Sequence, residues 1–195
     1  MIQNKLKNHN LILASGSPRR QQFFKDLGLE FEIRLKPVDE IYPDRLVHFE
    51  ITDYLAQLKS LAFKDELKPN DILVTSDTIV WHNKKALGKP VNHDDAFNML
   101  SAMSNTTHEV ITSICFTTKT VQKTVNSVTQ VTFKTLTKEE INYYIHNFKP
   151  FDKAGSYGIQ EWIGQIGISK IEGSYTNVVG LPTHLLYKTL NSMAL

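Results

Sequence analysis

Short apolar runs separated by polar turns predict a mixed α/β protein. Leu11–Ala14 and Ile72–Thr75 are continuous apolar runs that are too short for a helix, which is typical of buried strands. Each is followed by a polar turn, and polar residues of this kind punctuate the rest of the chain. Further strands are predicted at Phe31–Lys36, Ile79–Trp81, Val110–Phe116 and Val125–Phe133, the last two as a hairpin around Lys119–Lys123.

Helical periodicity appears between the predicted strands. Ser17 is a suitable N-cap and Pro18 a suitable first residue for a helix that Gly28 then ends. A second helical pattern runs from about Ile51 to Leu67. The remaining predicted helices are Ala96–Met103, a helix opened by the capping box Thr137/Glu140, and one that starts at Pro182. The glycine-rich stretch 150–182 predicts bends and not regular sheet.

The composition excludes some classes of protein and leaves the predicted fold unchanged. With 195 residues the chain has room for one large domain or two small lobes. A net charge of +2 argues against an extended nucleic-acid surface, and no apolar stretch approaches the length of a membrane span. The lone Cys115 lies between apolar neighbours and is predicted to be a core residue of a cytoplasmic protein.

The first predicted strand and helix are joined by the small residues Ser15–Ser17. A strand, a small-residue turn and a helix N-terminus together direct free backbone N–H groups at an anion. Arg19 and Arg20 lie in the first helical turn, where cations oppose the helix dipole at a cost of about 0.3–1 kcal/mol each. A bound polyphosphate would reverse that cost. The alternative is a pair of solvated surface arginines.

Lys59 lies on the apolar face of the second predicted helix, framed by Leu55 and Phe63. A lysine in this position either extends to the surface along its apolar neighbours or holds its charge in a cleft for an anion. In the second case, replacing Lys59 by methionine should leave thermal stability unchanged or improved and weaken the use of a triphosphate.

Acidic residues at two places in the chain could likewise be either structural or part of a binding site. Asp77 follows the apolar run Ile72–Thr75 and precedes Ile79–Trp81, and open α/β sheets usually bind ligands where a strand ends. It could also be a turn-forming aspartate. Asp39 and Glu40 lie in a polar connection, where they either face solvent or supply one carboxylate to a metal or ligand.

The motifs of the chain resemble those of the Maf family, from Leu11 to the last predicted helix. They are Ser15–Arg20, Ala56–Ser60, Ser76–Thr78, Leu87–Pro90, Lys153–Gln160 and Gly173–Pro182. The resemblance implies one Maf/ITPase-like α/β domain over residues 1–195, with a mixed twisted sheet flanked by helices and a central cleft between two lobes. It also implies a divalent metal (Mg, Mn or Co) and a possible homodimer.

The resemblance also implies roles for individual residues. Asp77 matches the family's proton acceptor, and Asp77 and Glu40 are the candidate metal ligands. Arg19, Thr78 and Gln160 match the positions that distinguish the dTTP/UTP subgroup from the 7-methyl-GTP subgroup. The substrate-binding positions are Ser15, Arg19, Arg20, Glu40, Lys59 and Lys89.

The implied activity is hydrolysis of dTTP and UTP, or of modified pyrimidine nucleotides, to a nucleoside monophosphate and pyrophosphate. The basic residues would gather countercharge for the triphosphate, and Asp77 would bind the metal, take a proton from the attacking water, or do both. Two alternatives are a nucleotidyltransferase-like enzyme that passes the nucleotide to an acceptor, and a non-catalytic nucleotide-binding regulator of cell division.

Overall fold

The computed structural model describes residues 1–193, and its strands form one seven-stranded mixed sheet. The order is β2-β1-β3-β5-β6-β7, with β4 paired to β3. β1 is parallel to both β2 and β3, whereas the β3–β4 and β6–β7 pairs are antiparallel. The strands are β1 (Asn10–Leu13), β2 (Glu32–Ile33), β3 (Asp71–His82), β4 (Lys85–Leu87), β5 (Thr107–Thr117), β6 (Gln122–Phe133) and β7 (Ile168–Glu172). The predicted mixed α/β fold is confirmed.

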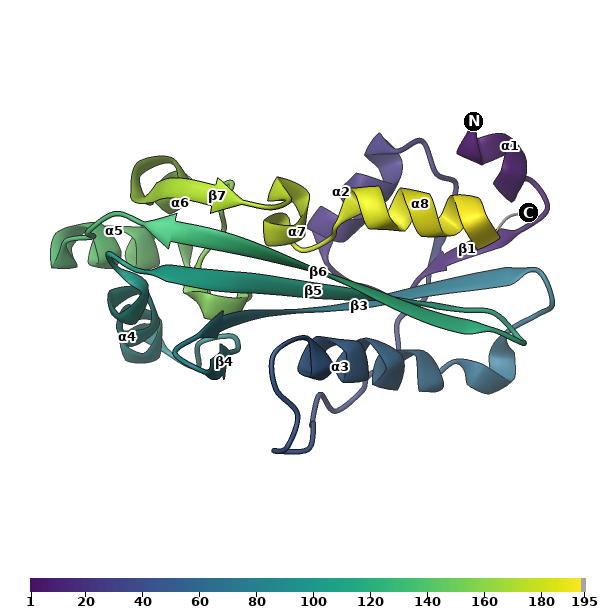
Figure 1. The fold of residues 1–195 in the computed structure, drawn as a ribbon, viewed down its shortest axis with the longest axis horizontal. Helices are drawn as coiled ribbons and strands as arrows, with labels where there is room; N and C mark the ends of the chain where they lie inside the picture. The colour runs from purple at the N-terminus through teal and green to yellow at the C-terminus, as the bar shows by residue number, and fades with distance from the viewer. Residues whose placement is uncertain (194–195) are drawn as a thin grey trace. The chain divides into compact units, whose positions relative to one another are not determined.

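Helices flank the sheet, and none within residues 1–193 is long and apolar enough to cross a lipid bilayer. They are α1 (Ile2–Leu6), α2 (Pro18–Asp26), α3 (Phe49–Leu61), α4 (His93–Met103), α5 (Lys138–Phe148), α6 (Trp162–Gly167), α7 (Tyr175–Val179) and α8 (Thr183–Met193), with the short 3₁₀ helices η1 (Lys64–Glu66) and η2 (Ala154–Ser156). Figure 1 shows these elements along the chain.

The chain forms two compact units, each with a hydrophobic core. The first, unit 1, consists of residues 1–77, 112–127 and those from Gly180 onward; the second, unit 2, consists of residues 78–111 and 128–179. Strands β3, β5 and β6 each contribute residues to both units.

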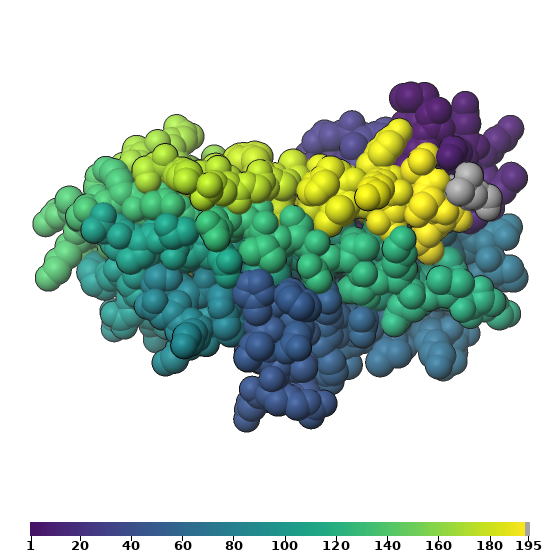
Figure 2. All heavy atoms as spheres, viewed as in Figure 1, coloured from purple at the N-terminus to yellow at the C-terminus, as the bar shows by residue number. Residues whose placement is uncertain are grey.

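In unit 1 the alternation of strand side chains builds two apolar layers. Leu13 and Val74 pack with the residues of α1, α2 and α8, while Ile12 and Leu73, one position earlier on each strand, pack with Phe63 beyond the end of α3. In Figure 1, α2 and α8 accordingly lie on one face of β1 and β3 and α3 on the other. The space-filling view shows the purple α1 residues against the yellow α8 (Figure 2).

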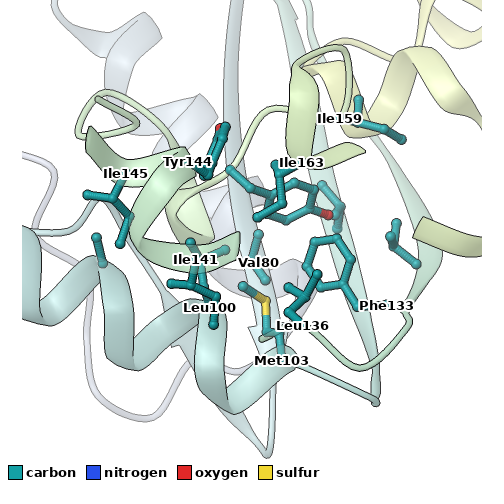
Figure 3. Close-up of a cluster of buried hydrophobic side chains, with 14 residues drawn as sticks. Val80, Leu100, Met103, Phe133, Leu136, Ile141, Tyr144, Ile145, Ile159 and Ile163 are labelled. Carbon is teal, nitrogen blue, oxygen red and sulfur yellow. The ribbon is translucent and has the colours of Figure 1, made fainter. Parts of the chain in front are cut away.

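The core of unit 2 is formed where α4 and α5 pack on the strands. Figure 3 shows this cluster, in which Tyr144 of α5 is buried among aliphatic side chains from α4, β3 and β6. Its labelled members are Val80, Leu100, Met103, Phe133, Leu136, Ile141, Tyr144, Ile145, Ile159 and Ile163.

Several elements differ from the sequence-based expectation. The strand predicted at Phe31–Lys36 is reduced to two residues at the edge of the sheet. The helix predicted to Leu67 ends at Leu61, although Leu67 itself is buried, so the periodicity indicated burial beyond the helical backbone. α1 was not expected, and β7 forms inside the glycine-rich stretch by pairing with β6.

Candidate functional site

The turn between β1 and α2 has the local structure that its sequence predicts. Ser17 is the N-cap of α2, and its hydroxyl accepts a hydrogen bond from the backbone N–H of Arg20 (3.5 Å). The Ser15 hydroxyl accepts from the backbone N–H of Ser17 (3.3 Å) and is buried. Ser15 therefore contributes to the shape of the turn.

Arg20 joins three parts of unit 1. Its Nε donates to the carbonyl oxygen of Gly180 (2.9 Å), and its Nη1 donates to the carbonyl oxygen of Ser76 on β3 (2.9 Å). Desolvation lowers the pKa of the Arg20 guanidinium, the carboxylate of Asp77 raises it, and the neighbouring Arg19 lowers it. Arg20 thus connects α2 to β3 and to the segment at Gly180, and it also puts a positive charge beside Asp77.

Asp77 lies within β3 and not at its end, because β3 is continuous through Ser76–Thr78. Its side chain is on the same face of the strand as Leu73 and Thr75, which is the face that α3 covers. There, Nζ of Lys59 donates to Oδ1 of Asp77 (2.6 Å) and forms a second ion pair with Oε1 of Glu40 (2.9 Å). Strand alternation and one helix thus bring both candidate carboxylates to the same lysine.

The two carboxylates differ in environment. Glu40 is half-exposed, with 50% of its side chain accessible, whereas only 7% of the Asp77 side chain is. Burial raises the pKa of the Asp77 carboxyl, and the charges of Lys59 and Arg20 oppose that rise. A carboxylate whose pKa is raised is a stronger base, which suits it to accept a proton from water.

Polar contacts that the sequence did not reveal hold α3 against the strands. The Thr75 hydroxyl donates to the carbonyl oxygen of Ala56 (2.6 Å), inside the helix. The Ser113 hydroxyl donates to Oδ1 of Asp53 (2.6 Å) and lies 2.6 Å from the Thr52 hydroxyl. These bonds fix α3, and so the place where the Lys59 side chain begins.

The remaining predicted site residues, Thr78, Lys89 and Gln160, belong to unit 2. Thr78 is half-buried on β3, while Lys89 and Gln160 are exposed. The segments that carry the last two are joined, because the backbone N–H of Gly155 donates to the carbonyl oxygen of Gly88 (3.0 Å). A side chain at Gly155 would prevent this approach, since its Cβ would lie 2.6 Å from Cγ2 of Val80.

The donor set at Lys59 is compatible with a hard divalent cation. Asp77 and Glu40 both contact the same nitrogen, so two carboxylates are available at one point. Within residues 1–193 no cluster of three or more His, Cys, Asp or Glu side chains is arranged to hold a metal ion. Mg²⁺ often binds through one or two carboxylates, with water and substrate phosphates as its other ligands.

Known proteins are similar to this chain over nearly its whole length. The family model Maf, described as "Maf-like protein", matches residues 10–193. Similar proteins named "dTTP/UTP pyrophosphatase" occur in Flavobacterium johnsoniae (64% identity, 99% of this chain and 100% of the relative) and Christiangramia forsetii (61%, 99% and 98%). Another from Phocaeicola vulgatus is 48% identical over 99% of this chain and 100% of its own length.

One solved structure supports the fold. The Staphylococcus aureus Ham1 protein is similar with a TM-score of 0.51 and 16% sequence identity, over 94% of this chain and 99% of that one. At that identity the likeness concerns the fold alone.

Proposed function

Because this chain belongs to the Maf family, we propose that it is a hydrolase that converts dTTP and UTP to the nucleoside monophosphate and pyrophosphate. The relatives named dTTP/UTP pyrophosphatase support the activity and the substrate class. The observation that carries the chemistry is the buried Asp77 paired with Lys59, because it puts a proton acceptor beside a cation.

The charged side chains of unit 1 have complementary roles in this proposal. Asp77 takes a proton from the water that attacks the α-phosphorus. Lys59, Arg19 and Arg20 supply positive charge for the triphosphate, and Lys89 stays a candidate for the same role from the sequence. Pyrophosphate can then leave without a covalent enzyme intermediate, because positioning and charge stabilisation supply most of the catalysis of phosphoryl transfer.

We also propose that a divalent cation takes part, held by Asp77 and Glu40. Such an ion would neutralise charge on the triphosphate oxygens. Both carboxylates interact with Lys59 in the structure, so the protein holds their negative charge in place with its own cation. A homodimer, a cytoplasmic location and the absence of nucleic-acid binding stay predictions from the sequence.

The test of the proposed function is a screen of common and methylated nucleoside triphosphates, without any acceptor. We expect release of pyrophosphate and monophosphate from dTTP and UTP, loss of that activity with EDTA, and recovery with Mg²⁺, Mn²⁺ or Co²⁺. Release only when an acceptor is added would favour a nucleotidyltransferase. Stoichiometric binding with no product would favour a regulator.

Gln160 is expected to select the base. Its amide could match the N3–H donor and O4 acceptor of thymine and uracil, whereas cytosine presents the reverse pattern. A polar group that the bound base covers and leaves unpaired costs about 1–3 kcal/mol, so dTTP should be favoured over CTP by roughly 5–150-fold in kcat/KM. Gln160→Ala should compress that ratio and leave the metal requirement unchanged. A wild-type enzyme that uses CTP or 7-methyl-GTP as well as dTTP would contradict the assignment.

A further inference from the structure

The exposed Gln160 lies in a turn whose ends are tied to one buried hydroxyl. The turn runs from Gly158 to Glu161 and is closed by the backbone N–H of Glu161, which donates to the carbonyl oxygen of Gly158 (3.0 Å). The hydroxyl of Tyr144 accepts from the backbone N–H of Gly158 (3.0 Å) and donates to Oε2 of Glu161. One side chain on α5 therefore contacts both the first and the last residue of the turn.

The second oxygen of Glu161 is also occupied. Nζ of Lys153 forms an ion pair with Oε1 of Glu161 (3.0 Å), and only 9% of the Lys153 side chain is accessible. Lys153 also donates to Oδ1 of Asp152 (2.7 Å). Both carboxylate oxygens of Glu161 thus have partners that come from residues outside the turn.

The rest of the turn leaves little freedom around Gln160. Ile159 is buried, at 6% exposure, and Figure 3 shows it in the same cluster as Tyr144. A Cβ on Gly158 would lie 2.9 Å from Cδ of Glu161 and 3.1 Å from Cε of Lys153. The side chains of Glu161 and Lys153 therefore approach the backbone as closely as a glycine permits, while Gln160 is exposed.

The segment before the turn is anchored as well. The hydroxyl of Tyr157 lies 2.7 Å from Nε2 of His108, and both residues are buried. Burial lowers the pKa of His108 to about 3, so its ring stays neutral at physiological pH. Burial also raises the pKa of the Tyr144 phenol, with the hydrogen bond to Glu161 adding to the rise, so Tyr144 keeps its proton.

We propose that Tyr144, Glu161 and Lys153 are positioning residues for base selection, because they fix the backbone from which Gln160 presents its amide. This inference rests on the proposed function. An amide can satisfy either the thymine or the cytosine pattern by rotating through half a turn, since its oxygen and nitrogen then exchange places. Discrimination therefore needs the amide to meet the base from a defined position, and a turn fixed at both ends holds the Gln160 backbone, from which the side chain starts, in one place.

The experiment compares kcat/KM for dTTP and CTP in Tyr144→Phe, which removes only the hydroxyl. We expect the dTTP/CTP ratio to fall to within about threefold of the ratio of Gln160→Ala, while the variant remains folded and active. Tyr143→Phe is the matched control, because Tyr143 is the neighbouring residue and is half-exposed. Its ring packs on that of Trp162, with 4.8 Å between the ring centroids. This control should keep the wild-type ratio.

A double variant separates positioning from general damage. If Tyr144 acts through Gln160, adding Tyr144→Phe to Gln160→Ala should not lower the ratio further. A Tyr144→Phe enzyme that loses dTTP and CTP turnover equally, with the ratio kept, overturns the inference. Glu161→Gln removes the carboxylate without removing its bulk, and it should lower the ratio even if Tyr144→Phe does not fold.

The dTTP/CTP selectivity of the wild-type enzyme separates failure of the proposed function from failure of this inference. A wild-type enzyme that does not distinguish dTTP from CTP overturns both the proposed base preference and the inference. A selective wild type whose selectivity survives Tyr144→Phe overturns the inference alone. If Tyr144→Phe does not fold, selectivity that survives Glu161→Gln does the same.

Discussion

Asp77→Asn should reduce pyrophosphate release from dTTP by at least about 10²–10⁴-fold, because general-base catalysis typically contributes that much. Asparagine preserves the shape of the side chain, but it cannot accept the proton of the attacking water. It would also give a metal ion a neutral ligand in place of a charged one. The measurement is kcat with saturating dTTP and metal, with circular dichroism to check that the variant is folded.

Asp71→Asn is the matched control for this experiment. Asp71 is a buried aspartate on the same strand, but its carboxylate accepts from Nδ2 of Asn10 (3.2 Å) and the backbone N–H of Lys68 (3.0 Å). We expect it to lower stability and to leave kcat within a few-fold of the wild type. Near-normal turnover in Asp77→Asn would remove this residue from the chemistry.

Lys59→Met should lower both activity and stability. A charge-assisted hydrogen bond contributes about 1.5–3 kcal/mol, so the loss of this cation should cost roughly 10–150-fold in kcat/KM for dTTP. The structure reverses the stability expected from the sequence, because Lys59 is paired with a buried aspartate. Removing one partner of a buried pair costs up to about 3–5 kcal/mol in the free energy of unfolding.

This loss of stability should depend on pH. Without Lys59 the pKa of Asp77 in the folded protein rises further above its unfolded value of about 3.9, since Lys59 lowers it in the wild type. Relative to the wild type, the penalty is therefore absent at low pH, where both folded proteins hold Asp77 protonated. It grows as the pH rises from the folded pKa of Asp77 in the wild type toward the still higher folded pKa in the variant. Urea titrations across this range provide the measurement.

Two further variants test the cause of this loss. Adding Asp77→Asn to Lys59→Met should restore stability, because no buried carboxylate is then left without a partner. Lys64→Met changes an exposed lysine just beyond the same helix and should be neutral. A loss of stability that is the same at every pH would instead assign the effect to packing of the Lys59 stem.

The sequence was most informative where structure depends on local chemistry. The bounds of α2 follow from three residues at its ends. Ser17 caps the first turn, Pro18 has a fixed φ suited to the first helical position, and Gly28 adopts the positive φ of +64° that ends the helix. The capping box of Thr137 and Glu140 is confirmed for the same reason. Such features need no information from distant parts of the chain.

The ion pair of Lys59 and Asp77 was beyond the reach of this reasoning. The sequence makes both residues candidates, but separate ones, because the apolar run Ile72–Thr75 stops before Ser76. In fact β3 continues through Asp77, and only that continuity aligns its side chain with Thr75 and so with α3. Neither local propensity nor spacing predicts which helix covers a given face of a strand.

Tyr144 shows a different limit. Helical periodicity after Thr137 puts Tyr144 on the apolar face of that helix, and its side chain is fully buried. The pattern treats tyrosine and phenylalanine alike, so the role of the hydroxyl in the Gly158–Glu161 turn was missed. The available signal was the residue type, because a buried tyrosine usually has a hydrogen-bond partner for its hydroxyl.

The contact between Arg20 and Gly180 has a consequence for the order of events during synthesis. The two residues are 160 positions apart, so at about 5–20 residues per second the ribosome makes Gly180 on the order of ten seconds after Arg20. Residues 78–111 and 128–179, which form unit 2, have all been made by then. Arg20 therefore lacks one of its carbonyl partners until nearly all of the chain has been synthesised, whereas its other partner, the carbonyl group of Ser76, is made early.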